Sequence, residues 1–267
     1  SPVDLVGKWN VEHFTNYLRT KGAARYEKQA FRGFLDTYIE AIHVSLQGDV
    51  PSVDRFVEKS VENAEFASLL ARLYPGAAFL HIIRNPYATL VSLRKHMTRD
   101  RYPFLGGAVD ALNNSYYYLY KNLKLLPRYK VIRYEDLVRT TREVMETVAD
   151  FIRIEFVEAL LEPTVMGKAW IGNSSSNKSF EGISNEPLVR WQQDINPLEG
   201  GLVNLLFSHI LDDYGYEHQR QDGSPYLPCA REYPRTYLAN RWLWRFKKRA
   251  SQNRPSRPRR FDQCVAN

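Results

Sequence analysis

The stretch from Phe79 to Ser92 constrains the fold more than any other part of the sequence. Residues 79–83 are a short apolar run rich in Ile, which predicts a buried strand with helices on both of its faces. Asn85 is a good N-cap and Pro86 suits the first position of a helix, so we expect a helix to begin directly after the strand. The chain therefore contains a strand, a tight turn and a helix.

Such a turn is a favourable place for an anion. Free N–H groups and the positive end of the helix dipole lie beside Arg84, which adds a bidentate donor. Ser92 follows Asn85 by about two helical turns, so its hydroxyl returns to the same face. We expect the two side chains to hold one phosphate. In the alternative interpretation, Arg84 pairs with a nearby carboxylate and the turn only starts a helix.

The Arg-Asn-Pro motif with a serine eight residues after the arginine resembles the 3′-phosphate site of sulfotransferases that use 3′-phosphoadenosine 5′-phosphosulfate (PAPS). A second motif, Glu58-Lys59-Ser60, is similar to a turn of glycan and protein sulfotransferases, although Val61 replaces the proline of that turn. The resemblance implies that Lys59 stabilises the transferring sulfonate, where negative charge develops. Without this resemblance, we would interpret Lys59 as an ordinary solvated lysine at a strand end.

A third motif follows the predicted strand 130–134 and reads Arg-Tyr-Glu-Asp-Leu. It resembles a signature of many sulfotransferases, which implies that Tyr134 approaches the nucleotide. Glu135 and Asp136 are expected to pair with Arg133 or to cap the turn, so we leave them off the site. Thr140 and Glu143 have capping-box spacing, which predicts the start of another helix.

A polar, glycine-containing segment spans residues 172–183 and precedes an Arg-Trp pair. Serine-rich segments are usually flexible loops. In the family, however, a Ser- and Lys-bearing loop before such a pair closes over the nucleotide. The resemblance therefore implies that Ser175, Lys178 and Arg190 donate to the cofactor.

The net charge of +7 is concentrated near the end of the chain. Residues 231–262 hold eleven Lys and Arg against two acidic residues, so this segment carries +9 and the rest −2. Because the body is close to neutral, we expect no specific nucleic-acid partner. We predict a domain over residues 1–219 and a basic tail over 220–267. Leu238, Trp242 and Phe246 lie four residues apart among basic residues, which predicts a short amphipathic helix that binds an anionic membrane or a polyanion. In the alternative interpretation, the segment is merely solvated.

These patterns predict an α/β fold of three layers, P-loop-like, with a mainly parallel central sheet. The family's 5′-phosphosulfate loop, similar to Pro-Lys/Arg-Ser-Gly-Thr, has no counterpart in the sequence, so we expect it to lie before Ser1 or to be lost. The resemblance covers residues 9–216. It implies transfer of a sulfonate from PAPS, without a metal, to a hydroxyl or amine of a carbohydrate, a protein tyrosine or a small molecule.

Two questions stay open from the sequence. The first is whether the chain is an active transferase or an inactive module that binds nucleotides or polyanions. The second is the compartment: the sequence has no run long enough to span a bilayer. We therefore expect the cytoplasm, or the Golgi lumen if an upstream anchor was removed.

Overall fold

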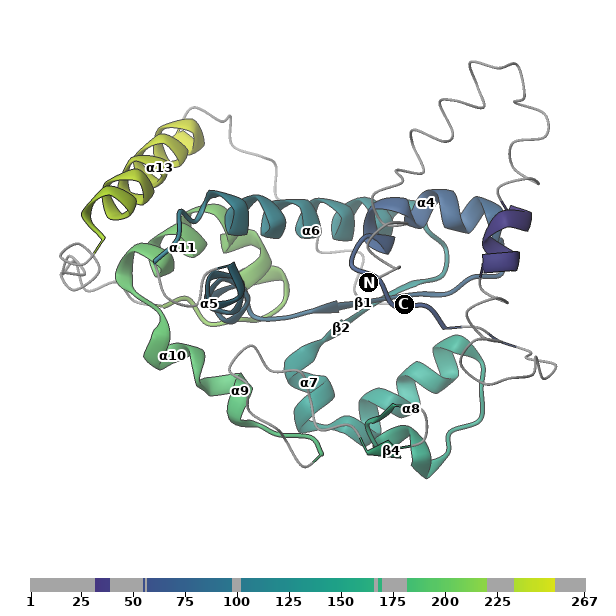
Figure 1. Cartoon of the computed structure of the whole chain (residues 1–267). Helices are drawn as coiled ribbons and strands as arrows, with labels where there is room; N and C mark the ends of the chain where they lie inside the picture. The colour runs from purple at the N-terminus through teal and green to yellow at the C-terminus, as the bar shows by residue number, and fades with distance from the viewer. Residues whose placement is uncertain are drawn as a thin grey trace, which may run out of the picture. The chain divides into compact units, whose positions relative to one another are not determined.

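The computed structural model describes residues 32–38, 55, 57–97, 102–165, 168–169, 182–219 and 233–252 (Figure 1). By its internal contacts the chain divides into two compact units. The first comprises residues 1–79 and 121–129, and the second comprises residues 80–120 and 130–267. Residues 166–167 and 170–181, with Ser175 and Lys178, lie outside the described residues.

In the first unit, residues 32–38 are helical and helix α4 spans Asn63–Leu73. The buried Asn122 donates from Nδ2 to the Ala64 carbonyl at 2.7 Å, which joins residues 121–129 to α4. The apolar spacing of residues 53–57 predicts a short strand, but Arg55 and Val57 lie in no strand, and residues 53, 54 and 56 lie outside the described residues.

Strand β1 (Phe79–Ile83) has the bounds that the sequence predicts, and helix α5 (Pro86–Met97) begins at the predicted residue. Strand β2 (Tyr129–Arg133) pairs with β1. The Phe79 N–H donates to the Arg128 carbonyl at 2.9 Å, so both strands start at the same end and run parallel. The described residues also contain an antiparallel pair, β3 (Thr164–Val165) and β4 (Lys168–Ala169). A helix-rich α/β fold with a small parallel sheet is therefore confirmed, whereas the three-layer arrangement stays a prediction.

The helices of the second unit surround its core. Tyr134 is the first residue of α7, not the last of a strand as predicted. The other elements are α6 (Gly106–Leu125, of which residues 106–120 belong to this unit), α7 (Tyr134–Arg139), α8 (Thr141–Ile152), the 3₁₀ turn η1 (Glu158–Leu161), α9 (Glu186–Val189), α10 (Trp191–Asp194), α11 (Pro197–Asp213) and α13 (Pro234–Gln252). Within the described part of the chain, no helix is long and apolar enough to cross a membrane.

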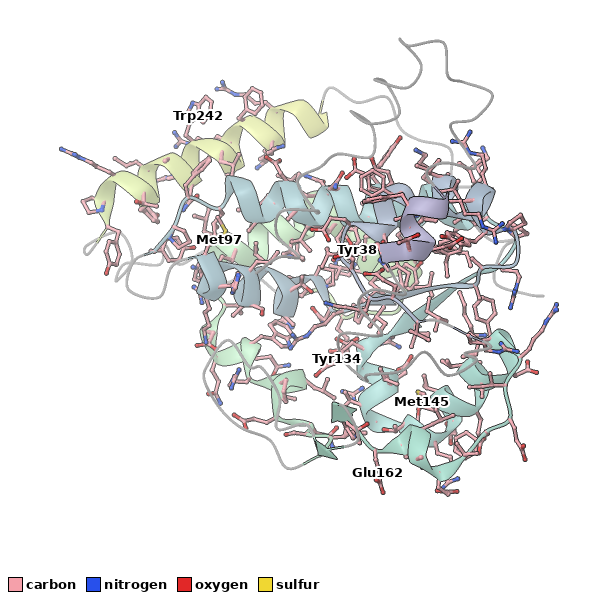
Figure 2. All side chains as sticks on the ribbon, turned by 45° about the vertical axis from the view of Figure 1, so that its right-hand side comes forward. Tyr38, Met97, Tyr134, Met145, Glu162 and Trp242 are labelled. Atoms are coloured by element: carbon pink, nitrogen blue, oxygen red, sulfur yellow. The ribbon has the colours of Figure 1, made fainter. Side chains whose placement is uncertain are left out.

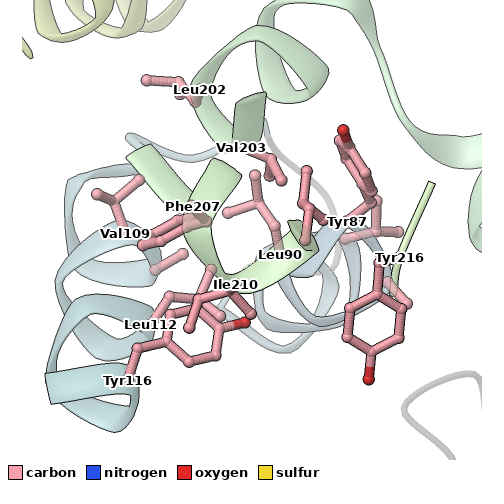
Figure 3. Packing of buried hydrophobic residues seen from close by; sticks show 14 of the residues in the cluster. Tyr87, Leu90, Val109, Leu112, Tyr116, Leu202, Val203, Phe207, Ile210 and Tyr216 are labelled. Carbon is pink, nitrogen blue, oxygen red and sulfur yellow. The ribbon is translucent and has the colours of Figure 1, made fainter. Parts of the chain in front are cut away.

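The core of this unit lies where α5, α6 and α11 meet. Figure 3 shows apolar side chains from all three helices in contact, among them Leu90, Val109 and Ile210, all fully buried. Tyr116 packs edge-on against Phe207 with ring centroids 5.2 Å apart. The buried Tyr116 therefore serves packing. The core thus fixes α5, and with it the turn between β1 and α5.

Burial alternates along β1, which corrects the expectation of a strand covered on both faces. Ile83 is buried, whereas Leu80 and Ile82 are 40% and 54% exposed. His81 lies on the covered side with Ile83, and burial lowers its pKa from 6.5 to about 4. Desolvation disfavours the imidazolium, so His81 is neutral at pH 7.

The depressed pKa of His81 makes stability depend on pH. His81 binds a proton near pH 6.5 in the unfolded chain and near pH 4 in the folded chain. The free energy of unfolding is therefore highest above pH 6.5 and falls as the pH drops below that value. Between pH 7 and pH 5, the free energy of unfolding should fall by about 2 kcal/mol more in wild type than in His81→Gln, as measured by urea unfolding. Equal losses in both proteins would contradict this prediction.

Candidate functional site

The turn between β1 and α5 is built as the sequence predicts. Asn85 accepts from the Tyr87 N–H at 3.0 Å through its side-chain oxygen, as an N-cap does. The Asn85 carbonyl accepts from the Thr89 N–H at 2.9 Å, which closes the first turn of α5. Pro86, at the first helical position, is buried. Local sequence therefore sets the direction in which the helix leaves the strand.

A buried carboxylate, which the sequence analysis left off the site, fixes this turn. Glu135 is 6% exposed, and its Oε1 accepts from the Asn85 N–H at 2.9 Å. Its Oε2 accepts from the Tyr216 hydroxyl, also at 2.9 Å. Asp136 pairs with Arg133 at 3.5 Å, as predicted. Glu135 is thus a positioning residue that joins the turn to the segment after α11.

Arg84 lies at the end of β1 with part of its hydrogen-bonding capacity unused. Nη2 donates to the Pro187 carbonyl at 2.7 Å, and the guanidinium lies 4.9 Å from the ring centroid of Tyr134. Nε is buried and has no hydrogen-bond partner among the described residues. Burial lowers the pKa of the guanidinium, while Tyr134 and Glu135 oppose that shift. A buried, unpaired N–H of a cation is costly unless a ligand accepts from it.

A cavity of about 500 Å³ opens beside Arg84. Its wall includes four of the residues that the sequence analysis assigned to the cofactor: Arg84, Ser92, Tyr134 and Arg190. The cavity is also lined by Met145 and Glu162, which Figure 2 labels together with Tyr134. The structure thus brings together Arg84 and Ser92, as the helical spacing predicts. Arg190 forms an ion pair with Glu186 at 3.4 Å.

Other wall residues were missed by the sequence analysis. Lys95 lies about one helical turn after Ser92, so its spacing in the sequence could have indicated its place in the wall. Its Nζ is 2.6 Å from Oδ2 of Asp194. Trp191 stacks on the core residue Tyr87 with ring centroids 5.4 Å apart. The remaining apolar wall comes from α5, α7, α8 and the segment 160–163, and includes Val91, Leu137, Leu160 and Pro163. Tertiary packing alone assembles this part.

Lys59 lies in the other unit, in an exposed turn that the side chains around it stabilise. Glu58 accepts from the Asn63 side-chain amide, and the Ser60 hydroxyl donates to Glu62 at 2.7 Å. These bonds attach the turn to the start of α4. The role of Lys59 at a sulfonate stays a prediction, as do the roles of Ser175 and Lys178.

The comparisons with known proteins agree with the three motifs. A family model described as "Sulfotransferase family" matches residues 8–158, more than half of the chain. The chain therefore belongs to the sulfotransferase family, whose general reaction is the transfer of a sulfonate group. Lys59, Arg84, Ser92 and Tyr134 fall within the matched residues, whereas Arg190 lies beyond them.

Among solved structures, the chain is similar to the "Sulfotransferase Domain from the Curacin Biosynthetic Pathway". The identity is 21%, the alignment covers 77% of this chain and 79% of that chain, and the TM-score is 0.49. The comparison with curated proteins gave no match.

Proposed function

We propose that the protein transfers a sulfonate from PAPS to a hydroxyl or amine of an acceptor, with a carbohydrate or a protein tyrosine as the first acceptors to test. Arg84 and Ser92 hold the 3′-phosphate, Tyr134 packs against the nucleotide, and Arg190 with Ser175 and Lys178 adds donors. Lys59 stabilises the charge on the sulfonate. When bound, PAPS supplies the activated sulfonate. The protein that holds it has a three-layer, P-loop-like fold.

The observation that carries this proposal is the cavity beside Arg84. Its volume lies within the range of about 300 to 1,000 Å³ typical of small-molecule sites. The unpaired Nε of Arg84 and the hydroxyl of Ser92 are suitable donors for a phosphate, and the apolar wall suits the faces of a purine. The residues of this chain therefore fit an adenosine nucleotide with a phosphate on its ribose.

A titration with 3′-phosphoadenosine 5′-phosphate (PAP) tests the assignment. We expect Arg84→Ala to weaken PAP binding by about 10- to 150-fold, because charge-assisted hydrogen bonds to the phosphate are lost. Adenosine 5′-phosphate lacks the 3′-phosphate, so its affinity should change little in the same variant. Calorimetry on the full chain gives both dissociation constants.

A matched control separates this effect from a general loss of positive charge. Arg139 is an exposed arginine at the end of α7, outside the cavity, and Arg139→Ala should bind PAP as wild type does. If wild type does not prefer PAP to adenosine 5′-phosphate, or if Arg84→Ala keeps that preference, there is no 3′-phosphate site at Arg84. Tight PAP binding without transfer to any acceptor would indicate a nucleotide-binding module in place of an enzyme.

A further inference from the structure

Helix α13 is held to the second unit by one of its sides. Asn240 is fully buried, accepts from the Leu105 N–H at 2.7 Å and donates to the Pro103 carbonyl at 2.9 Å. Leu243 is 8% exposed, and Trp244 packs against the core cluster. The helix packs on α11, as Figure 1 shows. Its orientation on the second unit is thus fixed by buried contacts.

The opposite side of α13 carries large apolar side chains that no described residue covers. Leu238, Trp242 and Phe246 are 62%, 65% and 54% exposed. They lie four residues apart and so form one stripe along the helix. The rings of Trp242 and Phe246 stack with centroids 5.6 Å apart, and Figure 2 labels Trp242. Exposed apolar residues are common singly, but a continuous stripe of this kind marks a contact surface.

The same side is strongly cationic. The helix contains six Lys and Arg and no acidic residue over its 19 positions. Five of the six are exposed: Arg235, Arg241, Arg245, Lys248 and Arg249. Helical spacing places Arg241, Arg245 and Arg249 beside the apolar stripe. Apolar rings flanked by arginines therefore face outward together along a helix about 28 Å long.

We propose that this outer face of α13 docks on the surface of an anionic lipid bilayer. Trp, Phe and Leu lie at the boundary between headgroups and acyl chains, while arginines bind lipid phosphates and carboxylates. A sulfated polysaccharide would engage the arginines but offers little apolar surface to Trp242 and Phe246. The charge and the apolar stripe together thus favour a bilayer. Because the opposite side of the helix is docked, α13 lies in the plane of the membrane and does not cross it.

Co-sedimentation of the full chain with vesicles tests the proposal. We expect binding to vesicles of phosphatidylcholine with about 30 mol% phosphatidylserine, weakening as salt rises, and little binding to phosphatidylcholine alone. The double variant Trp242→Ala/Phe246→Ala should bind at least about 10-fold less. Arg241→Gln/Arg245→Gln should bind about 30-fold less, with a smaller salt dependence.

Controls keep each outcome interpretable. The replaced side chains are exposed, so both variants should unfold at the same temperature as wild type. Leu125→Ala removes an exposed apolar residue of α6 and should bind vesicles as wild type does. Failure of wild type to bind anionic vesicles overturns the proposal. So does full binding by Trp242→Ala/Phe246→Ala, which would indicate a polyanion site. A wild-type dimer in ultracentrifugation that this variant dissociates would instead identify a protein interface.

Discussion

Replacing Glu199 by alanine is expected to lower the free energy of unfolding by about 3 to 5 kcal/mol. Glu199 is fully buried and forms an ion pair with Arg94, whose Nη1 lies 3.0 Å from Oε1. The Tyr102 hydroxyl donates to the same oxygen at 2.8 Å. Burial raises the pKa of Glu199, and Arg94 opposes that shift. Removing the carboxylate leaves a guanidinium that is largely buried without its counter-charge.

The same side chain also caps a helix. Glu199 and Asn196 form a capping box at the start of α11: the Glu199 N–H donates to Oδ1 of Asn196 at 3.0 Å, and the Asn196 N–H donates to Oε2 of Glu199 at 3.1 Å. Alanine therefore leaves the Asn196 N–H unsatisfied as well. The loss of stability in Glu199→Ala should therefore exceed that expected from removing a helix cap alone or an ion pair alone.

Urea unfolding measures the change in stability. Glu146→Ala, which removes an exposed carboxylate of α8, should change stability by no more than about 0.5 kcal/mol. Arg94→Met combined with Glu199→Leu should recover part of the loss, because neither charge is then left alone. A loss below about 1 kcal/mol for Glu199→Ala would show that the unit does not depend on this network.

Lys59→Ala is expected to lower kcat by about 10²- to 10³-fold, as the loss of a donor to developing charge does in other transferases and hydrolases. PAP affinity should be unchanged, because the proposed role of Lys59 concerns the sulfonate and not the 3′-phosphate. Formation of PAP from PAPS, with carbohydrate and tyrosine-peptide acceptors, reports the rate.

Lys124→Ala is the matched control, because Lys124 is an exposed lysine of the same unit. Its kcat should equal that of wild type. An unchanged kcat for Lys59→Ala would favour the alternative of an ordinary solvated lysine. Equal losses of PAP affinity and of kcat/KM, with kcat unchanged, would place Lys59 in nucleotide binding.

The sequence predicted those parts of the site that depend on local structure. Asn85 and Pro86 define the helix start from residue types alone, and the helical period then brings Ser92 to the side of Arg84. Trp191 and Leu160 could not be found in this way, because their place in the wall results from packing between segments far apart in the chain.

Two polar residues have hydrogen-bond partners other than those the sequence predicts. Thr140 is the N-cap residue of α8, so the predicted helix start is confirmed, but its hydroxyl donates to the Asp136 carbonyl at 3.1 Å and makes no capping-box bond. Serine and threonine hydroxyls often bond to the preceding turn, which competes with capping. Glu135 was expected to pair with Arg133 or to cap the turn. Its burial depends on the Tyr216 hydroxyl, 81 residues away, which no local pattern indicates.

The wall of the cavity beside Arg84 has a consequence for folding. Arg84 and Ser92 come from one part of the chain, whereas Pro187, Arg190 and Trp191 come from another about a hundred residues later. Contacts of such long sequence separation form late, since the loop between them must close first. The cavity is therefore completed only when these distant segments have packed together. A nucleotide bound there would stabilise the folded chain as a whole, by an amount set by its concentration relative to its dissociation constant.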